Sequence, residues 1–168
     1  MKVLFIGGTG LISSACTDLA VERGLELYLL NRSQSKKYPV PEGAHLLTGD
    51  VQGDPASLSH LFDSQHFDAV VDWVAYTPDD IERDIRLFSG KTGQFVFISS
   101  ASAYQKPPKH YLITEETPLE NPFWDYSQNK IACEQRLMQA YRQDGFPVTI
   151  IRPSLTYGPT QSGICDGP

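Results

Sequence analysis

Apolar and polar residues follow two different periods along this chain. Short, nearly continuous apolar runs, each bounded by glycine, proline or polar residues, are typical of strands that are buried on both faces. Such runs lie at residues 3–6, 25–30, 44–48, 69–74, 95–99 and 148–151. Between them, apolar residues recur at helical spacing. These stretches predict helices at residues 11–23, 55–62, 78–88 and 124–143.

The ends of these helices carry residues that suit helix termini. Gly24 and Gly145 follow two of the helices, Asp54 precedes a third, and Pro78 opens a fourth. Strands that alternate with helices indicate a parallel sheet with helices on both faces. We therefore expect an α/β fold with a doubly wound parallel sheet.

The composition excludes several classes of protein. The chain has 168 residues, 40% of them hydrophobic, which suits one domain with a packed core. Its formal net charge of -6 disfavours binding to nucleic acid or to an anionic membrane. The N-terminal apolar run is too short for a signal peptide or a membrane span. The cysteines, Cys16, Cys133 and Cys165, are odd in number, and no cysteine or histidine pair has metal-ligand spacing. We expect a cytoplasmic protein that binds no metal.

A glycine-rich segment joins the first strand to the first helix. Its glycines allow the backbone to turn tightly and to approach a pyrophosphate, whose charge the N–H groups of the helix start would stabilise. An ordinary strand-to-helix turn is the alternative, but the position directly after an N-terminal strand favours dinucleotide binding. The predicted contacts are Gly7, Thr9, Gly10, Leu11 and Ile12.

The second strand ends at Asn31 and Arg32. A carboxylate at this place would accept hydrogen bonds from the adenosine ribose and favour NAD. A guanidinium can instead pair with a ribose 2′-phosphate, so Arg32 favours NADP over NAD. The alternative is an ordinary exposed arginine in a loop.

The longest predicted helix begins with a tyrosine and a lysine four residues apart, Tyr126 and Lys130. The two share one helix face, which continues through apolar positions to Tyr141. A cation one turn away would stabilise a phenolate and bring the tyrosine pKa toward neutral pH, as a general base requires. Ser100, at the end of the fifth strand, could hold a substrate oxygen beside Tyr126. Chance pairing on a helix and a serine-capped turn are the respective alternatives.

Together these segments resemble the extended short-chain dehydrogenase/reductase family, the NAD(P)-dependent sugar-nucleotide epimerases and dehydratases with a Rossmann-type fold. The resemblance is carried by GGTGLIS at 7–13, SSASAY at 99–104, YSQNK at 126–130 and RPSLTYGP at 152–159, with TEETPLENP at 114–122. It implies that Tyr126 is the catalytic acid/base, that Lys130 lowers its pKa and binds the nicotinamide ribose, and that Ser100 orients the substrate. The other cofactor contacts that it implies are Asp50, Val51, Val74, Ala75, Ser99, Arg152 and Pro153.

The sequence departs from the family pattern in three places. Ser13 stands where the glycine fingerprint has its third glycine, and Asp-Trp-Val-Ala-Tyr at 72–76 replaces the more usual His-Leu-Ala-Ala. Family members also continue past the last motif into a smaller domain that binds the substrate. We therefore expect residues 1–158 to form the NAD(P)-binding domain and residues 159–168 to begin a substrate-binding region that is absent or truncated.

These features predict an enzyme that transfers a hydride at a secondary alcohol or carbonyl of a sugar nucleotide or a similar small molecule. Reduction, epimerisation and dehydration all stay open. One alternative is a non-catalytic NAD(P)-binding regulatory protein, which would be expected to lack Tyr126, Lys130 or Ser100. Another is a nucleic-acid-binding relative, which the net charge disfavours. The resemblance further implies a homodimer through the Tyr126 helix, and substrate contacts in the irregular stretch 105–122.

Overall fold

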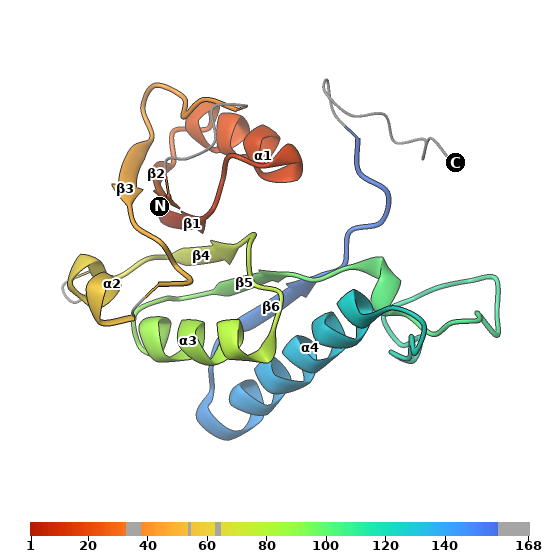
Figure 1. Ribbon diagram of the computed structural model, residues 1–168. Helices are drawn as coiled ribbons and strands as arrows, with labels where there is room; N and C mark the ends of the chain where they lie inside the picture. Colours follow the sequence, from red (N-terminus) through yellow and green to blue (C-terminus); the bar gives the residue numbers. More distant parts are fainter. Residues whose placement is uncertain (33–37, 54, 63–64, 158–168) are drawn as a thin grey trace.

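The computed structural model describes residues 1–32, 38–53, 55–62 and 65–157, which form a six-stranded parallel sheet in the order β3-β2-β1-β4-β5-β6 (Figure 1). The strands are β1 (Lys2–Ile6), β2 (Glu26–Asn31), β3 (His45–Thr48), β4 (Ala69–Asp72), β5 (Phe95–Ile98) and β6 (Val148–Ile151). The helices are α1 (Leu11–Glu22), α2 (Pro55–Phe62), α3 (Pro78–Phe88) and α4 (Asp125–Asp144), with a short 3-10 turn, η1 (Ala101–Ala103). The predicted doubly wound parallel sheet is confirmed. Asp54 and Cys165 lie outside the described residues.

The order of the strands reverses beside β1. This strand pairs with β2 on one side, Val3 beside Leu27, and with β4 on the other, Val3 beside Ala69. The loops that leave β1 and β4 therefore run to opposite faces of the sheet. In an open parallel sheet this divergence creates the crevice at the carboxyl ends of the strands where ligands bind.

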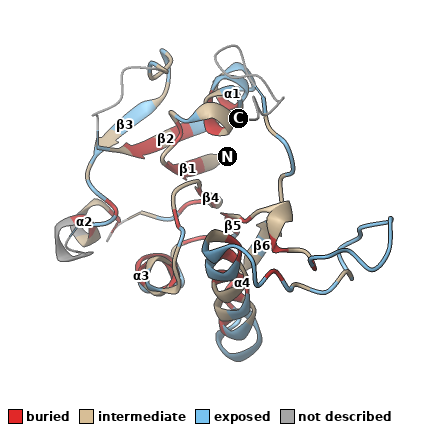
Figure 2. Cartoon of the chain, turned by 45° about the vertical axis from the view of Figure 1, so that its right-hand side comes forward, coloured by how far each residue is buried: buried red, intermediate tan, exposed pale blue. Residues whose placement is uncertain are grey.

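Alternate side chains of the strands pack into two separate apolar layers. On β1, Leu4 and Ile6 pack toward α2, α3 and α4, whereas Val3 and Phe5 pack toward α1. Figures 1 and 2 show α1 on one face of the sheet and the other three helices on the opposite face. The layer under the three helices is the larger, and its fully buried side chains include Phe62, Phe88 and Leu137.

Two details of the secondary structure differ from the prediction. Strand β4 ends at Asp72 because the Asp72 carboxylate accepts hydrogen bonds from the N–H groups of Val74 and Ala75, at 2.6 and 2.8 Å, which draws these residues out of the strand. On α4, Tyr141 is 54% exposed and does not continue the inward face. That face instead includes Glu134, which is 2% exposed one turn after Lys130.

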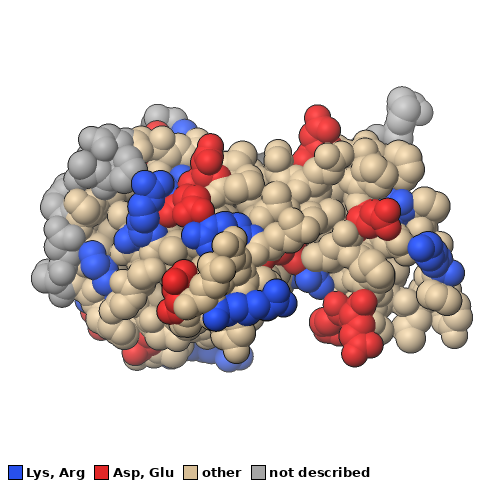
Figure 3. All heavy atoms as spheres, turned by 90° about the horizontal axis from the view of Figure 1, so that it is seen from below, with Lys and Arg blue, Asp and Glu red and all other residues tan. Residues whose placement is uncertain are grey.

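The surface carries charges of both signs. On the face seen in Figure 3, Lys and Arg side chains lie among Asp and Glu side chains. Among the described residues, no helix has the length and apolar character needed to cross a membrane. The same residues contain no group of three or more His, Cys, Asp or Glu placed to hold a metal ion.

Candidate functional site

A cavity of about 670 Å³ opens at the carboxyl ends of β1, β2 and β4. Its volume lies within the range of roughly 300–1,000 Å³ that is usual for small-molecule sites. The position is the crevice expected from the strand order. The lining includes many of the predicted cofactor contacts, namely Gly7, Thr9, Gly10, Asn31, Arg32, Asp50, Val51 and Val74.

The glycine turn at one end of the cavity is held by hydroxyl groups of α1. Gly8 has a φ of +106°, and a Cβ added there would lie 2.8 Å from Leu29 Cδ2, so this position requires glycine. Thr17 Oγ1 donates to the Gly8 carbonyl at 2.8 Å, and Ser13 Oγ accepts from the Gly10 N–H at 2.8 Å. Ser13 is thus a buried brace for the turn. The roles of Gly8 and Thr17 were not predicted from the sequence. The available signals were the second glycine of the turn and a hydroxyl group on the helix that follows it.

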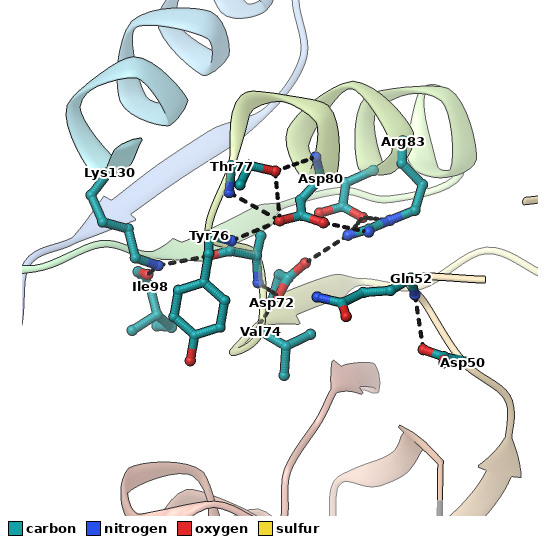
Figure 4. Close-up of polar contacts among 12 residues, drawn as sticks. Asp50, Gln52, Asp72, Val74, Tyr76, Thr77, Asp80, Arg83, Ile98 and Lys130 are labelled. Carbon is teal, nitrogen blue, oxygen red and sulfur yellow. Dashed lines mark hydrogen bonds and ion pairs between the residues drawn. The ribbon is translucent and has the colours of Figure 1, made fainter. Parts of the chain in front are cut away.

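The adenosine end of the cavity is lined by Asn31, Arg32 and Asp50. The Asn31 amide packs against the carbonyl groups of Gly7 and Leu30, so it supports the turn. Arg32 Nη1 lies 4.0 Å from Asp50 Oδ2, and about half of each side chain is exposed. Asp50 Oδ1 also accepts the Gln52 N–H at 3.0 Å (Figure 4). A cation and an anion therefore face each other at the end of the cavity where the sequence predicts the adenosine ribose.

Lys130 is 2% exposed and points from α4 toward the loop after β4. Its Nζ donates to the carbonyl oxygens of Ala75 at 2.7 Å and Ile98 at 2.8 Å, as Figure 4 shows. Burial lowers the pKa of Lys130, while nearby anionic groups oppose that shift. An ammonium group has three N–H donors. These two carbonyl groups occupy two of them, and the rings of Tyr76 and Phe97 lie with their centres 4.7 Å from Nζ.

Tyr126 lies one turn before Lys130, and Ser100 lies beside it. Ser100 Oγ accepts hydrogen bonds from the Ser102 N–H at 3.1 Å and the Ser102 hydroxyl at 2.9 Å. Burial raises the pKa of Tyr126 and Tyr76 adds to the rise, while a hydrogen bond with Ser100 opposes it. The expected lowering of the Tyr126 pKa by Lys130 is therefore wrong for this arrangement. Lys130 Nζ is 5.7 Å from the Tyr126 ring centre and bonds to backbone oxygens instead.

Aromatic rings enclose Tyr126. The ring of Trp124 lies 4.8 Å from it and that of Tyr76 lies 6.1 Å away, centre to centre. Trp124 is 54% and Tyr76 47% exposed, so both present ring surface to solvent next to the catalytic candidates.

Residues 105–118 enclose a separate cavity of about 420 Å³ in the irregular stretch that was expected to contact substrate.

The remaining predicted contacts make structural interactions. Ser99 is buried, and its hydroxyl donates to Glu134 at 2.5 Å. Ala75 is 1% exposed and contributes its carbonyl group to Lys130. The Pro153 carbonyl accepts the Ala101 N–H at 2.9 Å, which ties the chain after β6 to the serine turn. Leu11 and Ile12 form the first turn of α1 and are partly buried.

Arg152, which was expected near the nicotinamide, is not among the described residues that line the cavity. Its guanidinium forms a two-pronged ion pair with Glu134, with distances of 3.0 and 2.7 Å, and donates to the Tyr104 hydroxyl at 3.2 Å. Tyr104, a candidate pocket wall, is therefore engaged in this cluster. The sequence offered one signal for it, a Glu placed four residues after Lys130.

Comparisons with known proteins agree with this geometry. A model of the NAD dependent epimerase/dehydratase family matches residues 85–166. UDP-glucose 4-epimerase from Lactobacillus helveticus is 29% identical over 181 aligned residues, which cover 97% of this chain and 54% of that protein. These matches agree with the resemblance to the extended short-chain dehydrogenase/reductase family that the sequence motifs indicate.

Solved structures share the fold of this chain. UDP-glucose 4-epimerase from Bifidobacterium longum, in complex with NAD+ and UDP, has a TM-score of 0.77 at 20% identity over 90% of this chain and 52% of that one. Pal from Bacillus thuringiensis has a TM-score of 0.78 at 23% identity over 100% of this chain and 60% of that one. The chain thus spans about half the length of the epimerases that it matches.

Proposed function

We propose that this chain carries the cofactor-binding and catalytic residues of an enzyme that transfers a hydride at a secondary alcohol or carbonyl of a sugar nucleotide or a similar small molecule. The main support is that Tyr126, which bonds to Ser100, and Lys130 both lie against the ring of Tyr76, which lines the cavity of about 670 Å³ at the switch point of the sheet. Similarity to UDP-glucose 4-epimerase favours epimerisation over the other reactions of the family.

A nicotinamide dinucleotide, when bound, supplies the hydride acceptor and donor. Tyr126 takes the proton of the substrate hydroxyl as the C–H bond at the same carbon breaks, and it returns that proton when the hydride comes back. Ser100 holds the substrate oxygen in line with the Tyr126 hydroxyl. Lys130 binds the cofactor ribose through its ammonium group.

The choice between NAD and NADP rests on two residues of the cavity. Arg32 is suited to a 2′-phosphate, as expected from the sequence, but the Asp50 carboxylate 4.0 Å away repels the same phosphate. The opposing charges support use of either dinucleotide, with Arg32 favouring NADP. The family description favours NAD.

The proposal is tested with the full-length protein. Calorimetry should show binding of NAD+ or NADP+, and incubation with UDP-glucose should yield UDP-galactose, detected by chromatography. Tyr126→Phe should lose turnover and keep cofactor binding, whereas Tyr141→Phe, an exposed tyrosine on the same helix, should behave as the wild type. Failure of both dinucleotides to bind would refute the assignment, as would full activity of Tyr126→Phe.

The rival interpretations are weaker. A non-catalytic cofactor-binding protein would not need Tyr126, Ser100 and Lys130 together. Nucleic-acid binding would need a continuous basic surface, whereas charges of both signs mix on the face in Figure 3. A domain boundary at residue 158, a homodimer through α4 and a cytoplasmic location stay predictions. Residues 159–168 lie outside the described part of the chain.

A further inference from the structure

The loop after β4 is held by two carboxylates. Asp72 Oδ1 accepts the N–H groups of Val74 and Ala75, and Asp80 Oδ2 accepts those of Tyr76 and Thr77, at 2.9 Å each. Consecutive backbone donors are thereby satisfied from behind the loop. This arrangement fixes the carbonyl group of Ala75, to which Lys130 binds, and the walls that Val74 and Tyr76 give to the cofactor cavity.

Both carboxylates meet at one guanidinium group, that of Arg83. Arg83 Nη1 donates to Asp80 Oδ1 at 2.8 Å, and Arg83 Nη2 lies 3.9 Å from Asp72 Oδ2. Nε and Nη2 also donate to Asp84 Oδ1 at 3.1 and 3.0 Å. Arg83 is only 7% exposed, and Figure 4 shows it on α3 behind Asp72 and Asp80. A planar guanidinium can bridge several carboxylates in this way, which a lysine cannot.

Two buried carboxyl groups of this cluster, those of Asp72 and Asp84, lie close together. Asp72 and Asp84 are fully buried. Among the described residues, Oδ2 of each accepts no hydrogen bond, unless one of the two acids is protonated and donates to the other. Burial raises the pKa of Asp84 well above its ordinary value, and the charge of Asp72 and a hydrogen bond with it act in the same direction. Asp84 is therefore the acid of this cluster whose proton is most strongly held, while Arg83 contacts the carboxylates of Asp72 and Asp80.

We propose that Arg83 is a positioning residue for the site: through Asp72 and Asp80 it sets the loop 73–77, and through the Ala75 carbonyl it sets Lys130. The inference rests on the proposed function in one respect, namely that the loop lines the binding site of a dinucleotide. Arg83 itself lies behind the loop and touches neither the cavity nor Tyr126 in the contacts of the described residues.

The test compares Arg83→Met with Arg86→Met in the full-length protein. Arg86 is an exposed arginine on the same helix, so it is a matched control. One measurement is the Kd for NAD+, and the other is reductive methylation of Lys130, followed by peptide mass spectrometry with exposed Lys109 as the internal reference. Both are made well below the unfolding temperature of each variant, where a role in global stability alone changes neither.

We expect Arg83→Met to weaken NAD+ binding at least about tenfold, equivalent to about 1.4 kcal/mol, and to speed methylation of Lys130 several-fold. A folded Arg83→Met with wild-type affinity and wild-type methylation would overturn the inference. If Arg83→Met does not fold, Asp80→Ala decides, because it frees the N–H groups of Tyr76 and Thr77 and removes the Asp80 contact of Arg83, while Asp72 keeps its bonds to Val74 and Ala75. It should speed methylation of Lys130, and an unchanged rate would overturn the inference. Wild-type protein that binds neither NAD+ nor NADP+ would refute the proposed function, while the methylation result would still test Arg83.

Discussion

The buried ion pair between Glu134 and Arg152 should contribute to the free energy of unfolding, by an amount that follows from its burial. The Glu134 side chain is 3% exposed and that of Arg152 is 18% exposed. Removing one partner of a buried pair leaves the other charge without compensation, which costs about 3–5 kcal/mol. Arg152→Met leaves Glu134 buried with only the Ser99 hydroxyl as a donor. We predict a loss of about 3–5 kcal/mol in the free energy of unfolding.

Substitution of the other partner, Glu134, should reduce the free energy of unfolding by less. Glu134→Gln keeps an acceptor for Ser99, and Arg152 keeps its bond to the Tyr104 hydroxyl and partial contact with water. Loss of hydrogen bonds to a charged group then accounts for about 1.5–3 kcal/mol. The double variant, with neither charge, should be more stable than the sum of the single losses predicts, with a coupling energy of at least about 2 kcal/mol, within the range seen for contacting residues.

Urea unfolding, followed by circular dichroism and fluorescence without cofactor, measures all four proteins. A domain of this size has about 5–15 kcal/mol of stability, so the loss should be visible without complete unfolding. Arg142→Met, at an exposed position on α4, is the control and should stay within about 0.5 kcal/mol of the wild type. A loss below about 1 kcal/mol for Arg152→Met, or a coupling energy near zero, would refute the assignment of a desolvated, interdependent pair.

Three further predictions concern the site. Tyr126→Phe should reduce turnover at least about a hundredfold, as loss of general acid–base catalysis does, with the Kd for NAD+ changed less than about twofold; retained turnover would contradict its role. Asp50→Asn should tighten NADP+ binding and Arg32→Ala should weaken it, both measured by calorimetry, and equal effects on NAD+ would contradict a contact with the 2′-phosphate. The raised pKa of Asp84 means that the native state keeps a proton that the unfolded chain releases near pH 4. The resulting stabilisation is full below that pH and is lost as pH rises through the native pKa. Asp84→Asn should remove this dependence in urea unfolding across the pH series, and an unchanged slope would show that Asp84 is ionised.

Much of the fold follows from local sequence features. The apolar period located each strand to within a few residues, because strands of a parallel sheet are buried on both faces and carry nearly unbroken apolar runs. Helix α3 begins at Pro78 after Thr77, whose side chain and that of Asp80 cap each other's N–H groups. The early end of β4 could not be predicted, since it depends on how the Asp72 side chain turns back to the main chain.

The site was predicted less completely than the fold. Motif positions placed Ser100, Tyr126 and Lys130 correctly at strand and helix ends, because those ends meet at one edge of the sheet. The pKa of Tyr126 depends on Tyr76 and on local burial, and the partner of Ser99 lies 35 residues away on α4. Such contacts are tertiary, and residue spacing carries no information about them.

The parallel order of the strands has a consequence for how the protein is made. The glycine turn belongs to a local unit, β1 to β2, that leaves the ribosome before the rest of the sheet. Lys130 instead binds carbonyl groups 55 and 32 residues earlier in the chain, and both depend on β4 and β5 being paired. Contacts of such long range form late in folding. During synthesis the glycine turn can therefore form before the Lys130 contacts, which exist only after α4 docks against the assembled sheet.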